Sequence, residues 1–251
     1  RNEFVLHYQP QVSLEDGRLI GAEALVRWER KGEGLVPPNQ FIPVAEETGL
    51  IVPLGEWVLR EACAQWARWR AEGLAPSTLA VNISPRQFRQ QDLAKVVGRV
   101  LAETGMPASS LELELTEGAL MHQGVEAEVT LRELKGLGVE LAIDDFGTGY
   151  SSLAYLKRFP IDRLKIDQSF VRDISVDANG NELVSTIIAM ARNLNLRVLA
   201  EGVETSEQMA FLVDQNCDAC QGYLFSRPLP ADRFAALMAQ HDRSFSRSTP
   251  S

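Results

Sequence analysis

Short apolar runs alternate with longer stretches of mixed apolar and polar residues along most of the chain. From residue 79 onward, each short run has the length of a buried strand, and each longer stretch has the pattern of a helix that packs on a sheet. The predicted strands are Leu79–Ile83, Leu111–Thr116, Val139–Asp144, Arg163–Ile166, Arg197–Glu201 and Asp218–Gly222. The predicted helices between them are Asp92–Thr104, Val125–Leu137, Asn181–Leu194 and Ser206–Gln215. This alternation predicts right-handed crossovers that build a parallel sheet.

The beginning of the chain follows a different pattern. Two strand-like runs, Phe4–Val12 and Arg18–Trp28, flank the turn signal Glu15-Asp16-Gly17, so we expect a hairpin with one strand antiparallel to its neighbour. Two early strands and six later ones make eight, and 251 residues is the usual size of a (β/α)8 barrel. The predicted fold is therefore an α/β barrel of the TIM type with an irregular start. We expect it to span residues 1–243, with a flexible tail at 244–251.

The charge balance narrows the function. The chain has 25 Lys and Arg against 34 Asp and Glu, a formal charge of −9, so we expect no binding to DNA or RNA polymers, which requires a positive surface. No apolar run approaches the ~18 residues of a membrane span, so we expect no membrane contact in this segment. Three cysteines and the lack of a secretory leader favour a cytoplasmic location. Because the sequence begins at Arg1, we expect it to be cut from a longer chain that could carry a sensor domain or a membrane anchor upstream.

Acids and amides lie where a buried parallel sheet should be apolar. Strands covered on both faces normally have continuous apolar sequences, yet these carry polar residues near their C-terminal ends: Asn82, Glu114, Glu117, Asp144, Asp145, Asp167, Glu201 and Gln221. In a barrel of this type, those ends form the active face. In Leu111–Thr116 leucines alternate with Glu112 and Glu114, so both glutamates should point into the barrel if the leucines pack on helices.

The charges at these strand ends predict bound metal ions. Lys165 and Arg27 lie near the same ends, whereas the arginines that open later strands belong at the opposite end. Two cations do not neutralise five or more carboxylates, but divalent metals do. The available ligands are oxygens, so a hard ion such as Mg2+ or Mn2+ is expected rather than Zn2+. The adjacent pair Asp144-Asp145 suits two ions, an arrangement that supports phosphodiester hydrolysis.

Other candidate motifs carry less chemistry. The stretch Asp145–Ser152 is rich in glycine and directly follows the acidic pair, so we expect a loop that gates the site. Cys217 and Cys220 have CxxC spacing without a second pair, and we interpret them as buried thiols. The three histidines lie away from the acids, so histidine catalysis is not expected.

Several short motifs occur in an order that is highly specific. They are Glu23-Ala24-Leu25 followed by Val26-Arg27-Trp28, then Asn82-Ile83-Ser84, Glu114-Leu115-Thr116-Glu117, Asp144-Asp145-Phe146-Gly147-Thr148-Gly149, Lys165-Ile166-Asp167, Glu201-Gly202-Val203-Glu204 and Gln221-Gly222-Tyr223. In this order they resemble the EAL domain, a bacterial phosphodiesterase that hydrolyses the second messenger cyclic di-GMP. The resemblance extends from about Phe4 to about Met238 and implies linear pGpG as the product.

The resemblance also implies a role for each matching residue. Metal ligands are implied at Glu23, Asn82, Glu114, Asp144, Asp145 and Asp167, with Glu204 close by. Lys165 would orient the attacking water, and Glu201 would act as general base or as part of the metal shell. Substrate contacts are implied at Gln9, Arg27, Gln221, Phe225 and Pro228, with Gln221 in the inner shell. Glu117 would brace the loop Asp145–Ser152. That loop takes part in dimers of the family, so a homodimer is expected, and a cyclase-like domain often lies upstream.

Two other functions compete with this enzyme. A receptor that binds cyclic di-GMP without cleaving it would be expected to lose metal ligands or Glu201, and all of them are present. A metal enzyme that forms an enolate would need a second lysine or a histidine at a strand end, and none stands out. We therefore expect a phosphodiesterase with two Mg2+ or Mn2+ ions, in which Ca2+ permits binding but inhibits cleavage.

Overall fold

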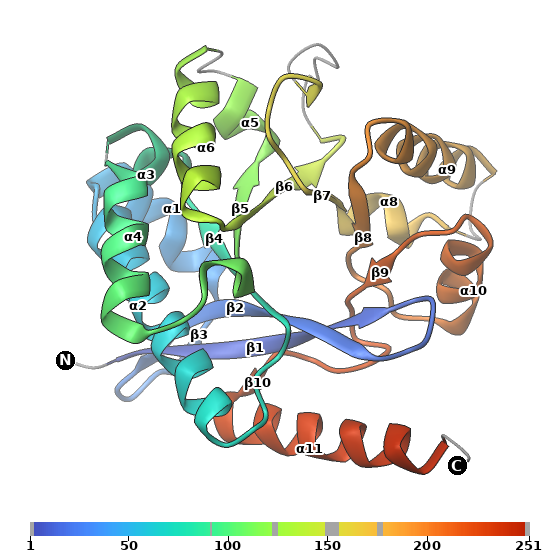
Figure 1. The fold of residues 1–251 in the computed structure, drawn as a ribbon, viewed down its shortest axis with the longest axis horizontal. Coiled ribbons are helices and arrows are strands. Elements are labelled where there is room, and N and C mark those ends of the chain that lie inside the picture. The colour runs from blue at the N-terminus through green and yellow to red at the C-terminus, as the bar shows by residue number, and fades with distance from the viewer. Residues whose placement is uncertain (1–2, 91, 122–124, 149–155, 175–177, 249–251) are drawn as a thin grey trace.

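Eight strands close into a barrel in the computed structural model, which describes residues 3–90, 92–121, 125–148, 156–174 and 178–248 (Figure 1). The strands of the closed ring are β1 (Phe4–Ser13), β2 (Leu19–Arg30), β4 (Thr78–Ile83), β5 (Leu111–Thr116), β6 (Glu140–Phe146), β7 (Arg163–Ile166), β8 (Arg197–Ala200) and β9 (Ala219–Cys220). Two short strands, β3 (Gly34–Val36) and β10 (Leu229–Pro230), extend the sheet beside β2 and β1. The predicted α/β barrel is therefore confirmed.

The irregular start is the hairpin of β1 and β2. Its register pairs Gln9 with Glu23, and the strands are antiparallel. On its other side β1 pairs antiparallel with β9, so β1 closes the barrel against the direction of the remaining strands. From β2 through β9 every neighbouring pair in the ring is parallel. Gly17 in the connecting turn has φ +74°, a conformation that glycine adopts without strain.

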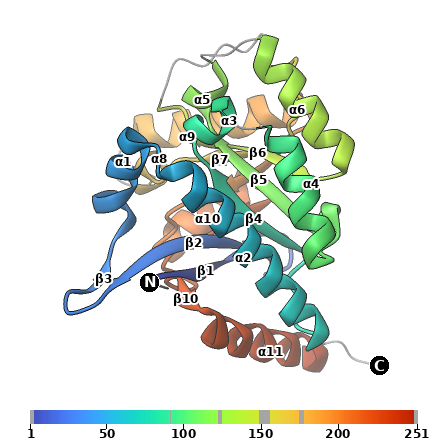
Figure 2. The ribbon, with the colours of Figure 1, turned by 90° about the vertical axis from the view of Figure 1, so that its left-hand side faces the viewer.

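Helices cover the outside of the barrel (Figure 1, Figure 2). They are α1 (Pro38–Thr48), α2 (Ile51–Ala71), α3 (Pro85–Gln90), α4 (Leu93–Thr104), α5 (Glu117–Met121), α6 (Val125–Leu137), α8 (Gln168–Arg172), α9 (Ala178–Asn193), α10 (Ser206–Asp214) and α11 (Ala231–Ser248), with a 3-10 turn at Ala108–Ser110. Figure 2 shows α2, α4 and α6 along one side of the strands and α11 beside the hairpin strand β1.

The hydrophobic core lies between the strands and these helices. Leu111, Leu113 and Leu115 of β5 are fully buried, as expected if they face the helices. Beside the hairpin, the Tyr8 and Trp69 rings lie 4.7 Å apart and Phe234 of α11 packs on both, so α11 joins the same core. The outward packing of the apolar residues turns the alternate residues of each strand into the barrel.

Several elements were not predicted from the sequence. The strands β3 and β10 are only three and two residues long, and α1 contains Pro43 within its span, which is unfavourable inside a helix. α11 continues to Ser248 and residues 249–251 lie outside the described part, so the flexible tail expected at 244–251 stays a prediction. A helix that is already formed adds further residues at little cost, and sequence composition alone did not reveal this extension.

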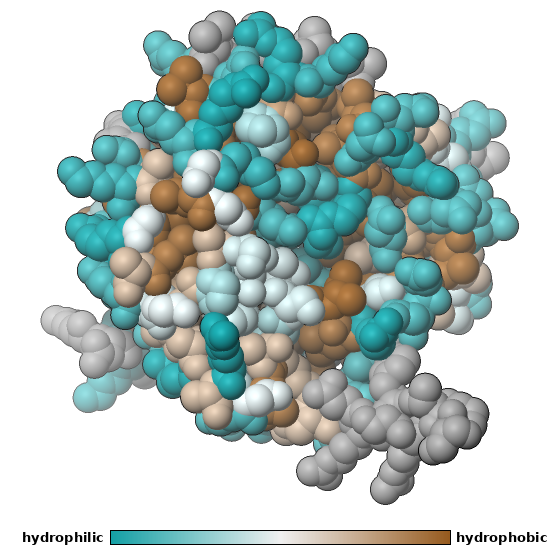
Figure 3. Space-filling view, viewed as in Figure 1, coloured by the Kyte–Doolittle hydropathy of each residue, from teal (hydrophilic) through white to brown (hydrophobic). Residues whose placement is uncertain are grey.

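Large apolar side chains at the surface are dispersed over several elements, including Leu35, Val44, Leu50, Val129 and Val213. Figure 3 shows the same mixture on the face drawn in Figure 1, where apolar residues form small groups among hydrophilic ones. Among the described residues, none of the helices has the length and apolar character needed to cross a membrane.

Candidate metal and catalytic site

Polar side chains from five neighbouring strands point into the same end of the barrel. Asn82 of β4 and Glu114 of β5 are partners in the parallel register, and Glu23 of β2 pairs with Ala80 of β4. Asp144 lies on β6, and Lys165 lies on β7. The strands are fixed by their hydrogen-bonded neighbours and hold these five side chains in place, and Glu201 and Gln221 join them from just beyond β8 and β9.

Lys165 lies at the centre of this cluster. Its Nζ is 2.8 Å from Glu114 Oε1, 2.8 Å from Glu201 Oε1, 3.0 Å from Asp144 Oδ1 and 3.9 Å from Glu23 Oε2, and its side chain is fully buried. Burial lowers the pKa of Lys165, but the carboxylates led by Asp144 and Glu114 outweigh it and raise the pKa well above the ordinary value. Lys165 is therefore charged, as expected, and one positive charge faces four acidic groups.

Glu23 is held by two amide donors. Asn82 Nδ2 donates to Glu23 Oε1 at 2.7 Å, and Gln221 Nε2 donates to Glu23 Oε2 at 2.5 Å. Burial alone would raise the pKa of Glu23, but Lys165 and these two donors outweigh it and lower the pKa. Gln221 Nε2 also donates to Glu201 Oε1 at 3.2 Å, so one amide links two of the acids.

Other carboxylates of the cluster lack hydrogen-bond donors. Both oxygens of Glu114 and Oδ1 of Asp144 are buried without a hydrogen-bond partner among the described residues, although both groups lie within ion-pair distance of Lys165. Burial raises the pKa of Glu114 well above its ordinary value, and burial raises that of Glu201 to about 8. Such costs are removed when a cation binds the carboxylates. These residues therefore fit a hard divalent ion.

The adjacent acids Asp144 and Asp145 both reach this site because β6 is distorted. The register between β6 and β7 shifts between Ile143 and Phe146, and Asp145 has φ +53°, in the left-handed region. In a regular strand, consecutive side chains would point to opposite faces. Here Asp144, Asp145 and Glu201 each place an oxygen within 4.8 Å of the other two. Burial and then the neighbouring Asp144 raise the pKa of Asp145 to about 6.

Asp167 and Glu204 differ in how closely they approach the cluster. Asp167 lies near enough to Asp145 to raise its pKa, and its own Oδ1 accepts from the backbone N of Ser169 at 3.0 Å, which caps α8. The Glu204 side chain is exposed, and no ion pair or hydrogen bond joins it to the acids within the described ranges. Its role as a metal ligand stays a prediction.

Glu117 contacts the loop that follows Asp145. Its Oε2 accepts a hydrogen bond from the backbone N of Gly147 at 3.2 Å, and its side chain is buried. This is the contact expected of a residue that braces the loop Asp145–Ser152. Residues 149–152 of that loop lie outside the described part of the chain.

Gln9 and Arg27, two of the residues expected to contact substrate, lie on β1 and β2 near Glu23. Gln9 Nε2 donates to the backbone O of Ser226 at 3.2 Å, which brings β1 beside the segment from Phe225 to Pro228. Arg27 is half-buried, and its Nη1 donates to its own neighbour, the backbone O of Val26, at 2.9 Å. Burial lowers the pKa of Arg27, and Glu23 opposes that shift.

A second ion pair fills the barrel below the cluster. Arg163 of β7 lies 2.8 Å from Glu112 of β5, and both side chains are almost completely buried. Each is two residues before a member of the upper cluster, Lys165 and Glu114, so both pairs point inward on the same strands. The expected inward direction of Glu112 is therefore confirmed. Burial raises the pKa of Glu112, and Arg163 opposes it.

One group near the site was missed by sequence reasoning. Gln11 is fully buried, and its Nε2 donates to Gln221 Oε1 at 3.3 Å. The alternation of Gln9 and Gln11 along β1 is a signal that could have found Gln11, because it places both amides on the inward face.

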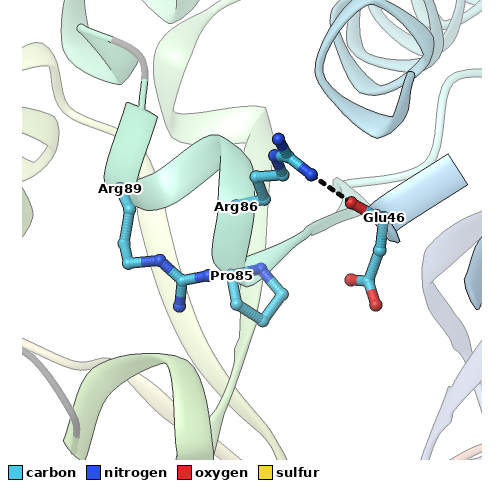
Figure 4. Close-up of a pocket in the computed structure, with 4 residues that line it drawn as sticks. All are labelled: Glu46, Pro85, Arg86 and Arg89. Atoms are coloured by element: carbon cyan, nitrogen blue, oxygen red, sulfur yellow. Dashed lines mark hydrogen bonds between the residues drawn. The ribbon is translucent and has the colours of Figure 1, made fainter. Parts of the chain in front are cut away.

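Two cavities in the described part of the chain lie away from the carboxylate cluster. One of about 370 Å3 is lined by Glu46, Pro85, Arg86 and Arg89 (Figure 4). Arg86 Nη1 there donates to the backbone O of Glu46 and so joins α3 to the end of α1. Another, of about 530 Å3, lies over α9. Neither is lined by a candidate site residue.

Known proteins are similar to this chain in sequence and in fold. The EAL domain family model matches residues 1–228. The chain is 47% identical over 239 residues to a Pseudomonas aeruginosa protein, Bifunctional diguanylate cyclase/cyclic di-GMP phosphodiesterase MucR, covering 95% of this chain and 35% of that protein. It is 44% identical over 233 residues to the Escherichia coli Cyclic di-GMP phosphodiesterase PdeR, covering 93% of this chain and 35% of that protein. The chain therefore spans about a third of the length of these relatives.

A solved structure shows the same fold. The structure titled PaMucR Phosphodiesterase, c-di-GMP complex superimposes with a TM-score of 0.90 at 47% identity, covering 93% of this chain and 95% of that one. The family match and the relatives agree with the order of motifs in the sequence and with the barrel that carries them. The chain belongs to the EAL domain family.

Proposed function

We propose that this chain hydrolyses cyclic di-GMP to linear pGpG with two divalent ions. The observation that carries this proposal is the unbalanced cluster around Lys165, where four acids meet one cation at the active end of the barrel. The names of the relatives support the substrate and the reaction, and the solved complex supports the ligand.

The donor set suits two neighbouring ions. Glu23, Asn82, Glu114 and Asp144 would hold one Mg2+ or Mn2+ ion, and Asp144, Asp145 and Asp167 would hold the other, with Glu204 close by. Bound there, the ions supply Lewis acidity to the phosphate and to the attacking water. The distorted strand at Asp145 supports this arrangement, because it turns two consecutive carboxylates toward one site.

Glu201 and Lys165 act on the attacking water in the proposed reaction. Glu201, kept ionised by the bound cations, would accept the proton of the water, and its carboxylate lies 2.8 Å from Lys165 Nζ. Lys165 stays protonated and orients the water, and it does not act as a base because the surrounding acids raise its pKa. The rigid strands keep both groups aligned for in-line attack.

In this proposal, residues beside the acids bind the nucleotide. Arg27 is available for a phosphate, and Gln9 with Phe225 and Pro228 forms an edge for a guanine base. Gln221 lies deeper, between these contacts and the acids, where its amide donates to Glu23 and Glu201. The hydrogen bond of Gln9 to Ser226 supports this grouping, since it joins residues 217 positions apart in sequence.

The test is a product assay on the purified chain. Cyclic di-GMP is incubated with Mg2+, with Mn2+ or with a chelator, and pGpG is measured by chromatography and mass spectrometry. A matched control is Glu140→Gln, because Glu140 pairs with Arg197 at the opposite end of the barrel and should not affect turnover. Formation of pGpG only with metal is the expected result. Tight binding without product would instead favour the receptor function.

A further inference from the structure

Gln11 is joined to the acids of the site through a second buried amide. Gln11 Nε2 donates to Gln221 Oε1 at 3.3 Å, and Gln221 Nε2 donates to Glu23 Oε2 at 2.5 Å and to Glu201 Oε1 at 3.2 Å. Gln11 is fully buried, and Gln221 has only 4% of its surface exposed. A chain of two amides therefore ends on two carboxylates.

The two carboxylates determine how Gln221 must be oriented. With a divalent ion bound, both carboxylates are ionised and only accept hydrogen bonds, so the NH2 group of Gln221 has to face them. Its carbonyl oxygen then points down into the barrel, where it needs a donor. The reverse orientation would place that oxygen against Glu23 and Glu201 and would remove a donor from each. Gln11 supplies the donor that makes the productive orientation the stable one.

The surroundings of Gln11 fit this role. Gln11 Oε1 is buried and has no hydrogen-bond partner among the described residues, which is unusual for a core amide. Oε1 lacks a partner because the NH2 group, at the other end of the same amide, is turned toward Gln221. The neighbouring Thr78 hydroxyl donates to the backbone O of Ile20 and is not directed at Gln11. Space for the amide comes from Gly21, where a Cβ would lie 2.6 Å from Gln11 Oε1.

The topology explains why this position can connect the two acids. Gln11 lies on β1, which pairs with β2 on one side and with β9 on the other. Glu23 belongs to β2, and Gln221 directly follows β9. The strand that closes the barrel thus carries the residue that holds Gln221, and Gln221 in turn reaches Glu23 on the other neighbouring strand.

We propose that Gln11 is a positioning residue that fixes the amide of Gln221 and thereby holds Glu23 and Glu201 in place to bind metal and water. The proposal deepens the site on which the proposed function rests. Gln11 acts through Gln221 and touches neither the substrate nor the reacting atoms. Partners of metal ligands typically change metal affinity by about 10–100-fold when they are removed. Gln11 is one contact further away, so a loss of about 5–10-fold is expected.

The test measures Mg2+ binding by calorimetry without substrate, beside turnover. Gln11→Met keeps the volume but removes the donor, and we expect about 5–10-fold weaker Mg2+ binding and a lower kcat. Thr78→Val is the matched control, because it removes a buried hydroxyl beside Gly21 that is not joined to the acids. It should bind Mg2+ as the wild type does.

A double-mutant cycle separates positioning from packing. Gln221→Leu should weaken Mg2+ binding by itself, and adding Gln11→Met to it should cause no further loss if Gln11 acts only through Gln221. Additive losses, or wild-type Mg2+ affinity in Gln11→Met, would overturn the proposal. If Gln11→Met does not fold, Gly21→Ala displaces the Gln11 side chain without changing it, and it should weaken Mg2+ binding in the same way. Unchanged affinity in a folded Gly21→Ala would equally contradict the proposal.

The Mg2+ titration keeps this result apart from the proposed function. If the wild type binds Mg2+ but forms no pGpG, the proposed hydrolysis fails, and the effect of Gln11 on Mg2+ affinity is still decided. If the wild type forms pGpG and Gln11→Met binds Mg2+ normally, the positioning role fails and the hydrolysis stands.

Discussion

The interior of the barrel contains two layers of charged side chains that differ in balance. In the lower layer, Glu112 and Arg163 form one buried pair at 2.8 Å, with one charge of each sign. In the upper layer, Lys165 faces four acidic groups. The lower pair lies on β5 and β7, and each of these strands also carries a member of the upper layer one inward position further along, Glu114 and Lys165. The difference indicates that the lower pair is complete as it stands, whereas the upper cluster requires additional positive charge to be stable in its ionised form.

The largest expected effect is on the upper layer. Glu201→Gln should lower kcat by about 10³-fold, because general acid–base groups contribute about 10²–10⁴-fold. Glu201→Ala should act in the same direction and leave nucleotide binding largely intact, since the bases and phosphates are held by other residues. The measurement is pGpG formation beside a cyclic di-GMP binding titration with Mg2+. Wild-type turnover in either variant would exclude Glu201 as the base.

Substitutions in the lower layer should lower the free energy of unfolding rather than change the catalytic step. Arg163→Met leaves Glu112 buried without its partner, and such a change costs about 3–5 kcal/mol in the free energy of unfolding. The double variant Glu112→Leu with Arg163→Met removes both charges and should recover most of the loss. Urea unfolding measures both values. If Arg163→Met were as stable as the wild type, the lower pair would contribute nothing to the fold.

The two layers also show what the sequence could and could not predict. The alternation of leucines with Glu112 and Glu114 predicted both inward positions, because successive side chains of a strand point to opposite faces. This alternation does not predict that Asp144 and Asp145 both reach the metal site, since that depends on the distorted register of β6 against β7. The link from Gln11 to Gln221 spans 210 residues, and it exists only because β1 closes the barrel against β9. Contacts that depend on closure have no local signal in the sequence.

A change of metal ion should affect the upper layer alone. Ca2+ has ligand distances of about 2.3–2.6 Å against 2.0–2.1 Å for Mg2+ and a looser geometry. It should keep cyclic di-GMP bound, because affinity depends mainly on charge neutralisation and base contacts. Cleavage should fall about 100-fold or more, because a misplacement of about 1 Å can have that effect. A binding titration and a product assay in each ion make the comparison. Full hydrolysis in Ca2+ would contradict a geometrically demanding site.

The smallest effect is expected at the edge of the upper layer, where Glu117 holds the backbone N of Gly147. Glu117→Ala leaves that N–H without its acceptor and frees the backbone two residues after Asp145, so kcat should fall by about tenfold, which corresponds to a cost of about 1–3 kcal/mol for an unsatisfied donor. Glu117→Gln keeps a carbonyl oxygen for the same hydrogen bond and should retain most of the activity. Turnover measured across a Mg2+ titration separates the two variants. If both lost activity equally, the charge of Glu117 and not its bond to Gly147 would matter, and the acidic layer would extend one residue further than the geometry of Asp145 indicates.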